Sequence, residues 1–543
     1  MHGLMMDTQL LVSRILQHAE CFHPNREIVS VTADNPLHRY TITDCARRTR
    51  QLANALGNLG LGEGDRVATL AWNDYRHLEI YYAVGGAGYV CHTINPRLFP
   101  EQIIFIINHA EDRWIFTDAM FVPLLEKIAG QTPGVEGYVV MTDDENMPET
   151  SLKNAVSYES LIAAESGEYE WPELDERAAV ALCYTSGTTG DPKGVLYSHR
   201  STTLHAYAAV APDVMNLSNR DSLLPVVPLF HVNAWGVPYA ALMVGAKLVF
   251  PGPKMGDGEA LYDLLESEGV TLALGVPTVW LALLQYTAAA GKRLNNLERT
   301  IIGGAAVPES MIREFHDKHR VAVHQGWGMT EMSPMGTVNT PKAGMESLSE
   351  DERMKLGTKA GRGIFGCELK IVDDKNEELP WDGKAYGALR VRGPWICSDY
   401  FKLEGKGGSH TEDGWFDTGD VATVDPEGYM AITDRTKDVI KSGGEWISSI
   451  EIENAAIGHP AVGEAAVIGV AHPKWTERPL LLVVKAEGAD VSKEDMLDWF
   501  DGKIAKWWLP DDVIFVDQLP HTATGKIKKV ELRQQFADYQ LPA

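Results

Sequence analysis

The stretch Tyr184–Gly194 reads YTSGTTGDPKG and directly follows the apolar run Ala179–Tyr184. It contains three glycines, four serine or threonine hydroxyls and Lys193. Free backbone N–H groups, hydroxyls and one cation are the groups that bind a polyphosphate. The spacing is not that of a Walker A loop, because two residues separate Gly190 from Lys193 and a glycine follows the lysine. A flexible turn has the same composition, so the surrounding sequence has to decide between the two interpretations.

Apolar strands alternate with helical segments after this loop, which is typical of parallel sheets covered by helices. The sequence therefore predicts an α/β fold. Ligands of such sheets bind at the carboxyl ends of the strands, so we expect the loops Thr185–Gly194, Gly303–Pro308 and Gln325–Glu331 to converge on one site. The predicted strands are Ala179–Tyr184, Ala246–Phe250, Thr271–Leu274 and Thr300–Ile302, and the predicted helices are one from about Ser198, Leu261–Glu268, Val279–Ala289 and Glu309–Lys318.

Composition limits the class of protein. A chain of 543 residues with 45% hydrophobic residues is typical of a globular protein of two to three domains. The 49 Lys and Arg residues against 75 Asp and Glu residues give a formal net charge of -26. This charge argues against a nucleic-acid partner, because binding to a phosphate backbone requires surplus basic charge. Small anions remain compatible with it, since loops and helix N-termini bind phosphate locally.

Neither cysteine spacing nor hydropathy indicates export or a membrane span. None of the six cysteines has CxxC spacing, so we expect reduced thiols in a cytoplasmic protein. The N-terminal residues lack a basic leader followed by a continuous apolar core, and they fit an amphipathic helix. No charged residue occurs from Ser222 to Ala246, but three prolines interrupt this run. We therefore expect two buried pieces around a polar turn, forming one wall of a pocket.

Four further motifs follow the glycine-rich loop. They are GWGMTE at Gly326–Glu331, DTGD at Asp417–Asp420, DRTKDVIKSGGEWIS at Asp434–Ser448 and PHTATGK at Pro520–Lys526. In this order, the five motifs resemble the adenylate-forming superfamily, which includes acyl-CoA synthetases, luciferases and amino-acid adenylation domains. The resemblance implies a large N-terminal domain of helix-covered, mostly parallel sheets (1–434), a hinge (435–441) and a small mobile α+β C-terminal domain (442–543).

The reaction implied by the resemblance starts with a carboxylate that attacks the α-phosphate of ATP, releasing pyrophosphate and leaving an acyl-adenylate. Glu331, with Thr185 nearby, is expected to hold Mg²⁺, because a hard cation prefers oxygen ligands. Thr330 is expected at the α-phosphate, and Lys526 is the expected catalytic bridge between the substrate carboxylate and that phosphate. The residues expected around the β- and γ-phosphates are Thr185, Ser186, Gly187, Thr188, Thr189, Gly190 and Lys193.

The same resemblance places the adenosine and the acyl group. Asp420 is expected to accept hydrogen bonds from the ribose hydroxyls, as an ionised carboxylate can, and Arg435 is expected to reach the ribose as well. Trp327 is expected to stack on the adenine. The other residues expected around the base are Gly303, Gln325 and Gly326, and those expected at the acyl pocket are His231, which we also place in the catalytic set, Trp235 and Gly303.

Coenzyme A is the expected acyl acceptor. Amino-acid adenylation domains carry an aspartate in the segment that corresponds to Pro228–Trp235, which has no acidic residue, and no carrier segment follows Lys526. No motif supports the oxidation step of a luciferase. In acyl-CoA ligases the C-terminal domain turns about a hinge residue, here Lys437. The residues expected on its CoA face are Gly443 and Gly444, which would open a pantetheine tunnel, Lys441 and Trp446, while Lys528 and Lys529 are expected at solvent or a CoA phosphate.

Within the ligases the sequence is similar to a bacterial group, through VVPLFHVNAWG, HTINPRLFPEQIIFIINHAED and IKSGGEWISS. This group includes fatty-acid–CoA ligases and the methylmercaptopropionate–CoA ligases of dimethylsulfoniopropionate breakdown. We favour a short or medium acid, 3-methylmercaptopropionate, with a medium- or long-chain fatty-acid–CoA ligase as the alternative. A protein that binds acyl-adenylate or CoA without turnover is a third hypothesis, disfavoured because Lys526, Glu331 and Asp420 are all present. Family members are often dimers, so a homodimer is compatible with the sequence.

Overall fold

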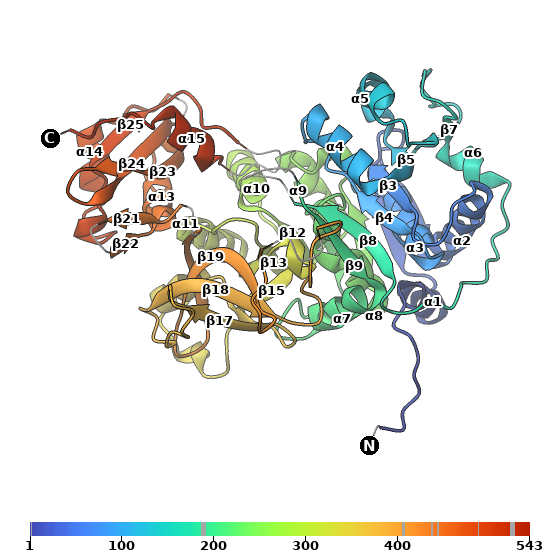
Figure 1. The fold of residues 1–543 in the computed structure, drawn as a ribbon, viewed down its shortest axis with the longest axis horizontal. Helices are drawn as coiled ribbons and strands as arrows, with labels where there is room; N and C mark the ends of the chain where they lie inside the picture. The colour runs from blue at the N-terminus through green and yellow to red at the C-terminus, as the bar shows by residue number, and fades with distance from the viewer. Residues whose placement is uncertain are drawn as a thin grey trace.

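The computed structural model describes residues 1, 3–185, 192–403, 408–435, 438–442, 445–486, 488–521 and 527–542, with residues 445 and 446 described by their backbone alone. Within these ranges the chain forms four β-sheets surrounded by helices (Figure 1). Two large sheets, mostly parallel, belong to the N-terminal part, and a smaller C-terminal unit, red in Figure 1, stands at one end of the molecule. This arrangement confirms the predicted fold class.

A seven-stranded sheet carries the glycine-rich loop. Its strand order is β7-β6-β5-β3-β4-β8-β9, and all neighbours are parallel except β8 and β9. The strands are β3 (Arg66–Leu70), β4 (Val90–Thr93), β5 (Asp112–Thr117), β6 (Gly137–Val140), β7 (Val156–Ser157), β8 (Ala179–Tyr184) and β9 (Gly194–Ser198). We predicted β8 but not β9, which pairs antiparallel with it, so the loop closes a β-hairpin instead of joining a strand to a helix.

A nine-stranded sheet forms the second layer, with the order β16-β15-β14-β13-β12-β10-β11-β1-β2. The strands from β14 to β1 are parallel, and antiparallel strands flank them at both edges. The strands are β1 (Glu27–Ser30), β2 (His38–Thr41), β10 (Ser222–Pro225), β11 (Lys247–Phe250), β12 (Leu272–Gly275), β13 (Arg299–Ile302), β14 (Ala322–Gly328), β15 (Met335–Val338) and β16 (Arg362–Gly363). Strands β11, β12 and β13 lie within one residue of their predicted positions.

Helices cover both sheets. Those before the C-terminal unit are α1 (Val12–Phe22), α2 (Ile42–Asn58), α3 (Tyr75–Gly86), α4 (Pro100–Ala110), α5 (Val122–Ile128), α6 (Tyr158–Ala163), α7 (His199–Val210), α8 (Val237–Val244), α9 (Gly258–Ser267), α10 (Pro277–Ala290), α11 (Glu309–Glu314) and α12 (Glu350–Gly357). The predicted helices α7, α9 and α10 are present. The predicted helix Glu309–Lys318 is α11 followed by a short π-helix, Phe315–His319, and Pro308 is its N-cap.

Helix α3 lies between the two large sheets, because it contacts β4 and β8 of one sheet and β1 of the other. All of its twelve residues are buried, so its charged side chains need partners inside the protein. Arg76 pairs with Asp34 at 3.0 Å and Glu159 at 2.9 Å. Glu79 pairs with Arg48 at 2.8 Å. These ion pairs join α3 to α2, to α6 and to the loop between β1 and β2.

The uncharged segment from Ser222 to Ala246 folds as predicted, into two buried pieces around a turn. β10 forms the first piece and α8 the second, and the turn at Val232–Gly236 precedes α8. Among the helices that the structure describes, none combines the length and apolar character needed to cross a membrane.

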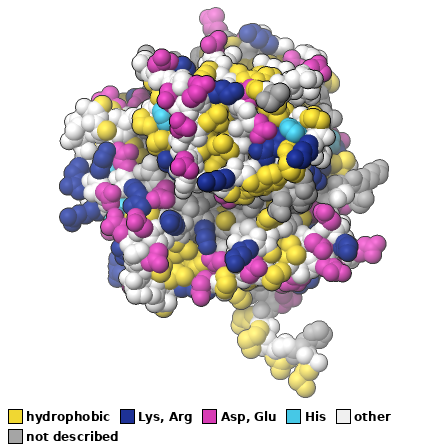
Figure 2. Space-filling view, turned by 90° about the vertical axis from the view of Figure 1, so that its left-hand side faces the viewer, with side chains coloured by type: hydrophobic (Ala, Val, Ile, Leu, Met, Phe, Trp, Pro, Cys, Tyr) yellow, Lys and Arg dark blue, Asp and Glu magenta, His cyan; other side chains and the backbone are white. Residues whose placement is uncertain are grey.

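The last two sheets lie on either side of the predicted hinge. The antiparallel strands β17 (Glu368–Val372), β18 (Tyr386–Arg392), β19 (Phe416–Val424) and β20 (Met430–Arg435) form one of them. The C-terminal unit contains β21 (Ile440–Ser442), β22 (Glu445–Ile447), β23 (Val462–His472), β24 (Thr476–Lys485), β25 (Asp512–Phe515), α13 (Ser449–Ile457), α14 (Lys493–Trp499) and α15 (Lys529–Gln535). The chain therefore changes sheets between Arg435 and Ile440, within the predicted hinge, although the exact domain limits stay a prediction. Figure 2 views the molecule from the side where the C-terminal unit stands, and acidic and basic side chains are interspersed on this face.

Candidate active site

Thr185 and Lys193 fix the base of the β8–β9 hairpin. The Thr185 N–H donates to the Lys193 carbonyl oxygen at 2.9 Å, and the Lys193 N–H donates to the Thr185 hydroxyl at 3.1 Å. Because β8 runs parallel to β4, Thr185 lies at the carboxyl edge of the sheet, where α/β proteins bind ligands. The other predicted phosphate-loop residues lie outside the described residues, and they are Ser186, Gly187, Thr188, Thr189 and Gly190.

Glu331 is a buried carboxylate in the short 3₁₀ helix Thr330–Met332, which follows β14; the residue is 7% exposed. The Tyr400 hydroxyl donates to Glu331 Oε1 at 2.7 Å. The Tyr197 hydroxyl donates to the carbonyl oxygen of the preceding residue, Thr330, at 2.6 Å. Burial first, and then the Glu331 carboxylate, raise the pKa of Tyr400, so its phenol keeps the proton that it donates.

Tyr400 also links Glu331 to the phosphate hairpin. The Lys193 ammonium lies 4.7 Å from the centre of the Tyr400 ring, so two predicted site residues far apart in the chain meet on one side chain. Tyr400 was not among the predicted site residues. The surrounding sequence SDYFKL carries no glycine pattern or catalytic motif that would single out one aromatic residue.

The predicted adenosine residues Trp327, Asp420 and Arg435 meet on three strands, β14, β19 and β20. Asp420 is 3% exposed. Its Oδ2 accepts a hydrogen bond from Trp327 Nε1 at 2.9 Å, and Arg435 Nε lies 2.7 Å from its Oδ1. Trp327 and Arg435 therefore both hold the buried carboxylate, and Arg435 reaches Asp420 itself. A carboxylate offers two acceptor sites on each oxygen, which is the chemistry that recognition of ribose hydroxyls requires.

Gly303, which follows β13, is packed against Gly326 of β14 and against Trp235. A Cβ atom placed on Gly303 would come within 2.8 Å of the Gly326 carbonyl oxygen and 3.0 Å of the Trp235 ring. Only a glycine allows this close approach. The Gln325 side chain is buried beside them and accepts a hydrogen bond from the Val307 N–H at 3.3 Å. The structure thus packs Gly326, predicted at the base, against Gly303 and Trp235, both predicted at the acyl pocket.

The turn that presents Trp235 has an unusual backbone. Every residue of Val232–Gly236 has a φ between 46° and 75°, a left-handed conformation that costs roughly 1–2 kcal/mol for each residue with a Cβ. A buried amide holds the turn, because Asn233 Oδ1 accepts hydrogen bonds from the Tyr81 hydroxyl and the Cys183 thiol, both at 3.2 Å. The position of Trp235 is therefore fixed by the tertiary structure around the turn.

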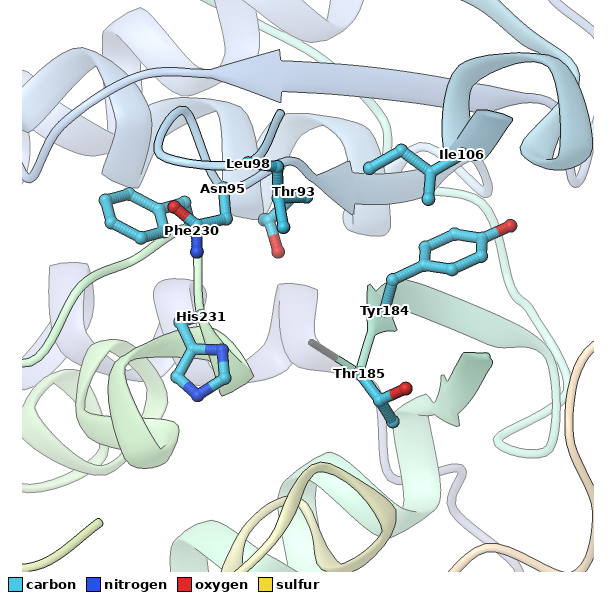
Figure 3. A pocket seen from close by; sticks show the side chains of 8 residues that line it. All are labelled: Thr93, Asn95, Leu98, Ile106, Tyr184, Thr185, Phe230 and His231. Carbon is cyan, nitrogen blue, oxygen red and sulfur yellow. The ribbon is translucent and has the colours of Figure 1, made fainter. Parts of the chain in front are cut away.

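His231 borders a small cavity beside the phosphate hairpin. Figure 3 shows His231 and Thr185 on one side of this cavity, opposite Thr93 and Asn95 from the end of β4. Its volume is about 10 Å³, which is room for about one water molecule. In this conformation the cavity is too small to hold an acyl chain.

The family model described as AMP-binding enzyme matches residues 16–401, which is more than half of the chain. The chain belongs to the AMP-binding enzyme family. The model of the AMP-binding enzyme C-terminal domain matches residues 451–526, in the smaller unit of the structure.

Relatives of this AMP-binding enzyme match it over its whole length. A 3-methylmercaptopropionyl-CoA ligase from Ruegeria lacuscaerulensis is 54% identical over 538 residues, 99% of each chain. A medium-chain-fatty-acid–CoA ligase from Ectopseudomonas oleovorans is 51% identical over 541 residues, 100% of this chain and 98% of the relative. The crystal structure of ATP-bound MatB from Rhodopseudomonas palustris has a TM-score of 0.81 and 26% identity, covering 97% of this chain and 99% of that one. The predicted membership of the adenylate-forming superfamily is confirmed.

The predicted hinge and the C-terminal domain of this AMP-binding enzyme carry the remaining predicted residues. Lys441 lies on β21, where its N–H donates to Glu477 Oε2 at 2.8 Å, and its backbone pairs with that of Trp446 on β22. The side chain of Trp446 is outside the described atoms. Also outside the described residues are Lys437, Gly443, Gly444 and Lys526.

We expected Lys529 at solvent or at a CoA phosphate, but its ammonium is paired within the protein. The ammonium pairs with Glu453 Oε1 at 2.8 Å and donates to the Ser449 hydroxyl at 2.5 Å. The Asp434 carboxylate accepts from the same serine. The expectation was wrong because a run of lysines does not reveal which of them a helix will turn inward. Lys529 instead ties α15 to α13 beside the predicted hinge.

Proposed function

We propose that the protein is an ATP- and Mg²⁺-dependent acyl-CoA ligase, which forms an acyl-adenylate from a carboxylic acid and then an acyl-CoA thioester. The observation that carries this proposal is the convergence of three charged groups from separate segments. Lys193 and Glu331 meet on Tyr400, and Trp327, four residues before Glu331, contacts Asp420. A cation, a buried carboxylate and a second buried carboxylate are the groups required by phosphates, a metal ion and a ribose.

The first half-reaction brings a carboxylate to an α-phosphate, so the protein has to position and neutralise two anions. Lys193 and the hairpin loop would hold the β- and γ-phosphates, and Asp420 would hold the ribose. Glu331 and the Thr185 hydroxyl offer only oxygen donors, which fits Mg²⁺. Within the described part of the chain, Glu331 receives its side-chain hydrogen bond at Oε1, and this leaves Oε2 for a cation. Mg²⁺ bound there would neutralise phosphate charge during the transfer.

For the remaining steps we propose roles that rest on the family resemblance. Lys526 would bridge the substrate carboxylate and the α-phosphate during adenylation. The C-terminal domain would then turn about Lys437, so that Gly443 and Gly444 open a passage for pantetheine, with Lys441 and Trp446 on the same face. The change of sheet between Arg435 and Ile440 supports a hinge in this segment.

The ligase proposal is tested by separating the two half-reactions. The protein with ATP, Mg²⁺ and a carboxylic acid should release pyrophosphate, and added CoA should give AMP and a thioester in equal amounts. The panel runs from propionate to palmitate and includes 3-methylmercaptopropionate. Absence of pyrophosphate with every acid would overturn the proposal and favour a binding protein without turnover.

We propose 3-methylmercaptopropionate, or another short acid, as the preferred substrate. Two observations support this choice. A relative 54% identical to the chain is named a 3-methylmercaptopropionyl-CoA ligase, and the Trp235 ring packs on Gly303, where it would limit the length of an acyl pocket. The alternative is a longer fatty acid. It is supported by the medium-chain relative and by a long-chain-fatty-acid–CoA ligase from Thermus thermophilus that is 46% identical over 536 residues, 98% of this chain and 97% of that one.

Trp235→Ala should shift the chain-length preference toward longer acids. In the wild type, each methylene beyond the best acid would clash with the indole instead of gaining the usual ~0.8 kcal/mol of burial. We expect the wild-type kcat/KM to peak for acids of about four to six heavy chain atoms. In the variant, kcat/KM for short acids should fall about 10-fold, because a large aromatic contact is lost, and the relative rate with long acids should rise.

The matched control is Trp381→Ala, which removes an exposed indole (42% exposed). This variant should keep the wild-type chain-length profile. If the wild-type profile rises steadily up to palmitate, the short-acid proposal is wrong and the long-chain ligase takes its place.

The proposal also includes a homodimer, which sedimentation of the purified protein would test, and a cytoplasmic location, which cell fractionation would test.

A further inference from the structure

The segment Cys397–Phe401, which follows β18, contacts both the 3₁₀ helix that contains Glu331 and the β8–β9 hairpin. The Cys397 N–H donates to the Glu331 carbonyl oxygen at 2.8 Å, and the Phe401 N–H donates to the Gly194 carbonyl oxygen, also at 2.8 Å. The first hydrogen bond holds the segment to the helix Thr330–Met332, and the second holds it to the β8–β9 hairpin. Tyr400 lies between these two attachments and is 4% exposed, so its side chain is held in one place.

We propose that Tyr400 is a positioning residue with two tasks: its hydroxyl orients the Glu331 carboxylate toward a divalent cation, and its ring keeps the Lys193 ammonium beside the nucleotide phosphates. The inference rests on the proposed function and assigns a role to a residue outside the five motifs. Its basis is the 2.7 Å hydrogen bond to Glu331 Oε1 and the 4.7 Å contact between the ammonium and the ring centre.

The hydroxyl acts on the direction of the carboxylate. Glu331 is buried, so without a donor its Oε1 would be left unsatisfied or would turn toward another partner. With Oε1 held by Tyr400, Oε2 is directed away from the phenol and is the oxygen that a hard cation would take. Loss of a donor that orients a metal-binding carboxylate typically weakens metal binding about 10–100-fold.

The ring acts on the lysine. Lys193 has a flexible four-carbon side chain, and a cation within about 6 Å of an aromatic face is attracted to it. The ring also spaces the two charges, because no ion pair joins Lys193 to Glu331 in the structure although both groups contact Tyr400. Without this spacer the ammonium and the carboxylate would attract each other at short range. Each would then be less available to phosphate or metal.

Two substitutions separate the tasks. Tyr400→Phe keeps the ring and removes the hydroxyl, so we expect Mn²⁺ affinity in the presence of ATP to fall about 10-fold, with ATP binding in EDTA unchanged. Tyr400→Leu removes the spacer as well, so both affinities should fall. Electron paramagnetic resonance of free Mn²⁺ measures metal binding, and calorimetry with ATP in EDTA measures nucleotide binding. The Mg²⁺ concentration that gives half-maximal pyrophosphate release should rise in parallel with the Mn²⁺ dissociation constant.

Tyr429→Phe is the matched control, because Tyr429 is equally buried and donates its hydroxyl to the Thr340 carbonyl oxygen at 2.7 Å. The proposal is overturned if Tyr400→Phe binds Mn²⁺ as the wild type does, or if Tyr429→Phe weakens Mn²⁺ binding equally. A wild type that binds Mn²⁺ with ATP but releases no pyrophosphate defeats the proposed function, while the comparison of Mn²⁺ affinities still decides the role of Tyr400. A wild type that binds no Mn²⁺ with ATP overturns both.

Discussion

Lys526→Ala should slow pyrophosphate release by ~100- to 1,000-fold, because removing one oriented charge or donor from a transition state costs ~3–4 kcal/mol. Lys526 is the one lysine or arginine of the PHTATGK motif that could bridge the substrate carboxylate and the α-phosphate. A pyrophosphate-coupled assay at saturating ATP and acid measures the loss. Acylation of the Lys526 side chain should have the same effect, since it removes the same charge.

The second half-reaction provides the internal control for Lys526. Thioester formation from preformed acyl-adenylate and CoA should persist in Lys526→Ala, because the proposed rotation has moved the lysine away by that step. Lys503→Ala removes an exposed lysine of the same domain, whose ammonium lies over the Trp499 ring, and should leave both half-reactions unchanged. Equal loss of the two half-reactions in Lys526→Ala would mean that the lysine is structural.

Asp420→Asn should raise the KM for ATP by ~10- to 100-fold, because a hydrogen bond to a charged group contributes ~1.5–3 kcal/mol. The buried carboxylate accepts from Trp327 Nε1 and faces Arg435 Nε. An amide in its place presents one NH₂ group to one of these donors and leaves the Arg435 guanidinium without its charge partner. Steady-state kinetics with ATP as the varied substrate measure the change, and the KM for the acid should stay constant.

Asp425→Asn is the control in the same β-hairpin, since Asp425 pairs with Lys359 at 2.5 Å at the turn between β19 and β20. It removes a comparable carboxylate at the turn, beyond the strand ends, and should change the melting temperature without changing the KM for ATP. If Asp420→Asn and Asp425→Asn lower stability equally and neither alters the KM for ATP, Asp420 is a structural residue.

Much of the fold follows from local sequence. Strand β8 has the predicted bounds, and β11, β12 and β13 lie within one residue of theirs, because each is a short apolar run between polar residues or glycines. The sequence analysis did not predict strand β9. GVLYS has a strand-like pattern, but it becomes a strand only by pairing with β8, and its position straight after a glycine-rich loop favoured a connection to a helix.

Motifs located several predicted site residues that the structure places close together. Glu331 and Asp420 are acidic residues of their motifs, and both are buried, as expected for groups held by protein donors. The order and spacing of five motifs were enough to indicate the family, which the comparison with known proteins then confirmed.

Contacts between distant segments could not be read from any motif. Tyr400 meets Glu331 and Lys193, Arg435 pairs with Asp420, and Lys529 pairs with Glu453. Each of these contacts joins residues on different strands, helices or loops, so it depends on how the sheets and their connections pack. The left-handed turn at Val232–Gly236 is a further case, because its backbone is unfavourable locally and is held by Tyr81 and Cys183 from other elements. Local preference chooses the strands and helices, whereas the direction of a buried side chain is chosen by the neighbours that burial brings to it.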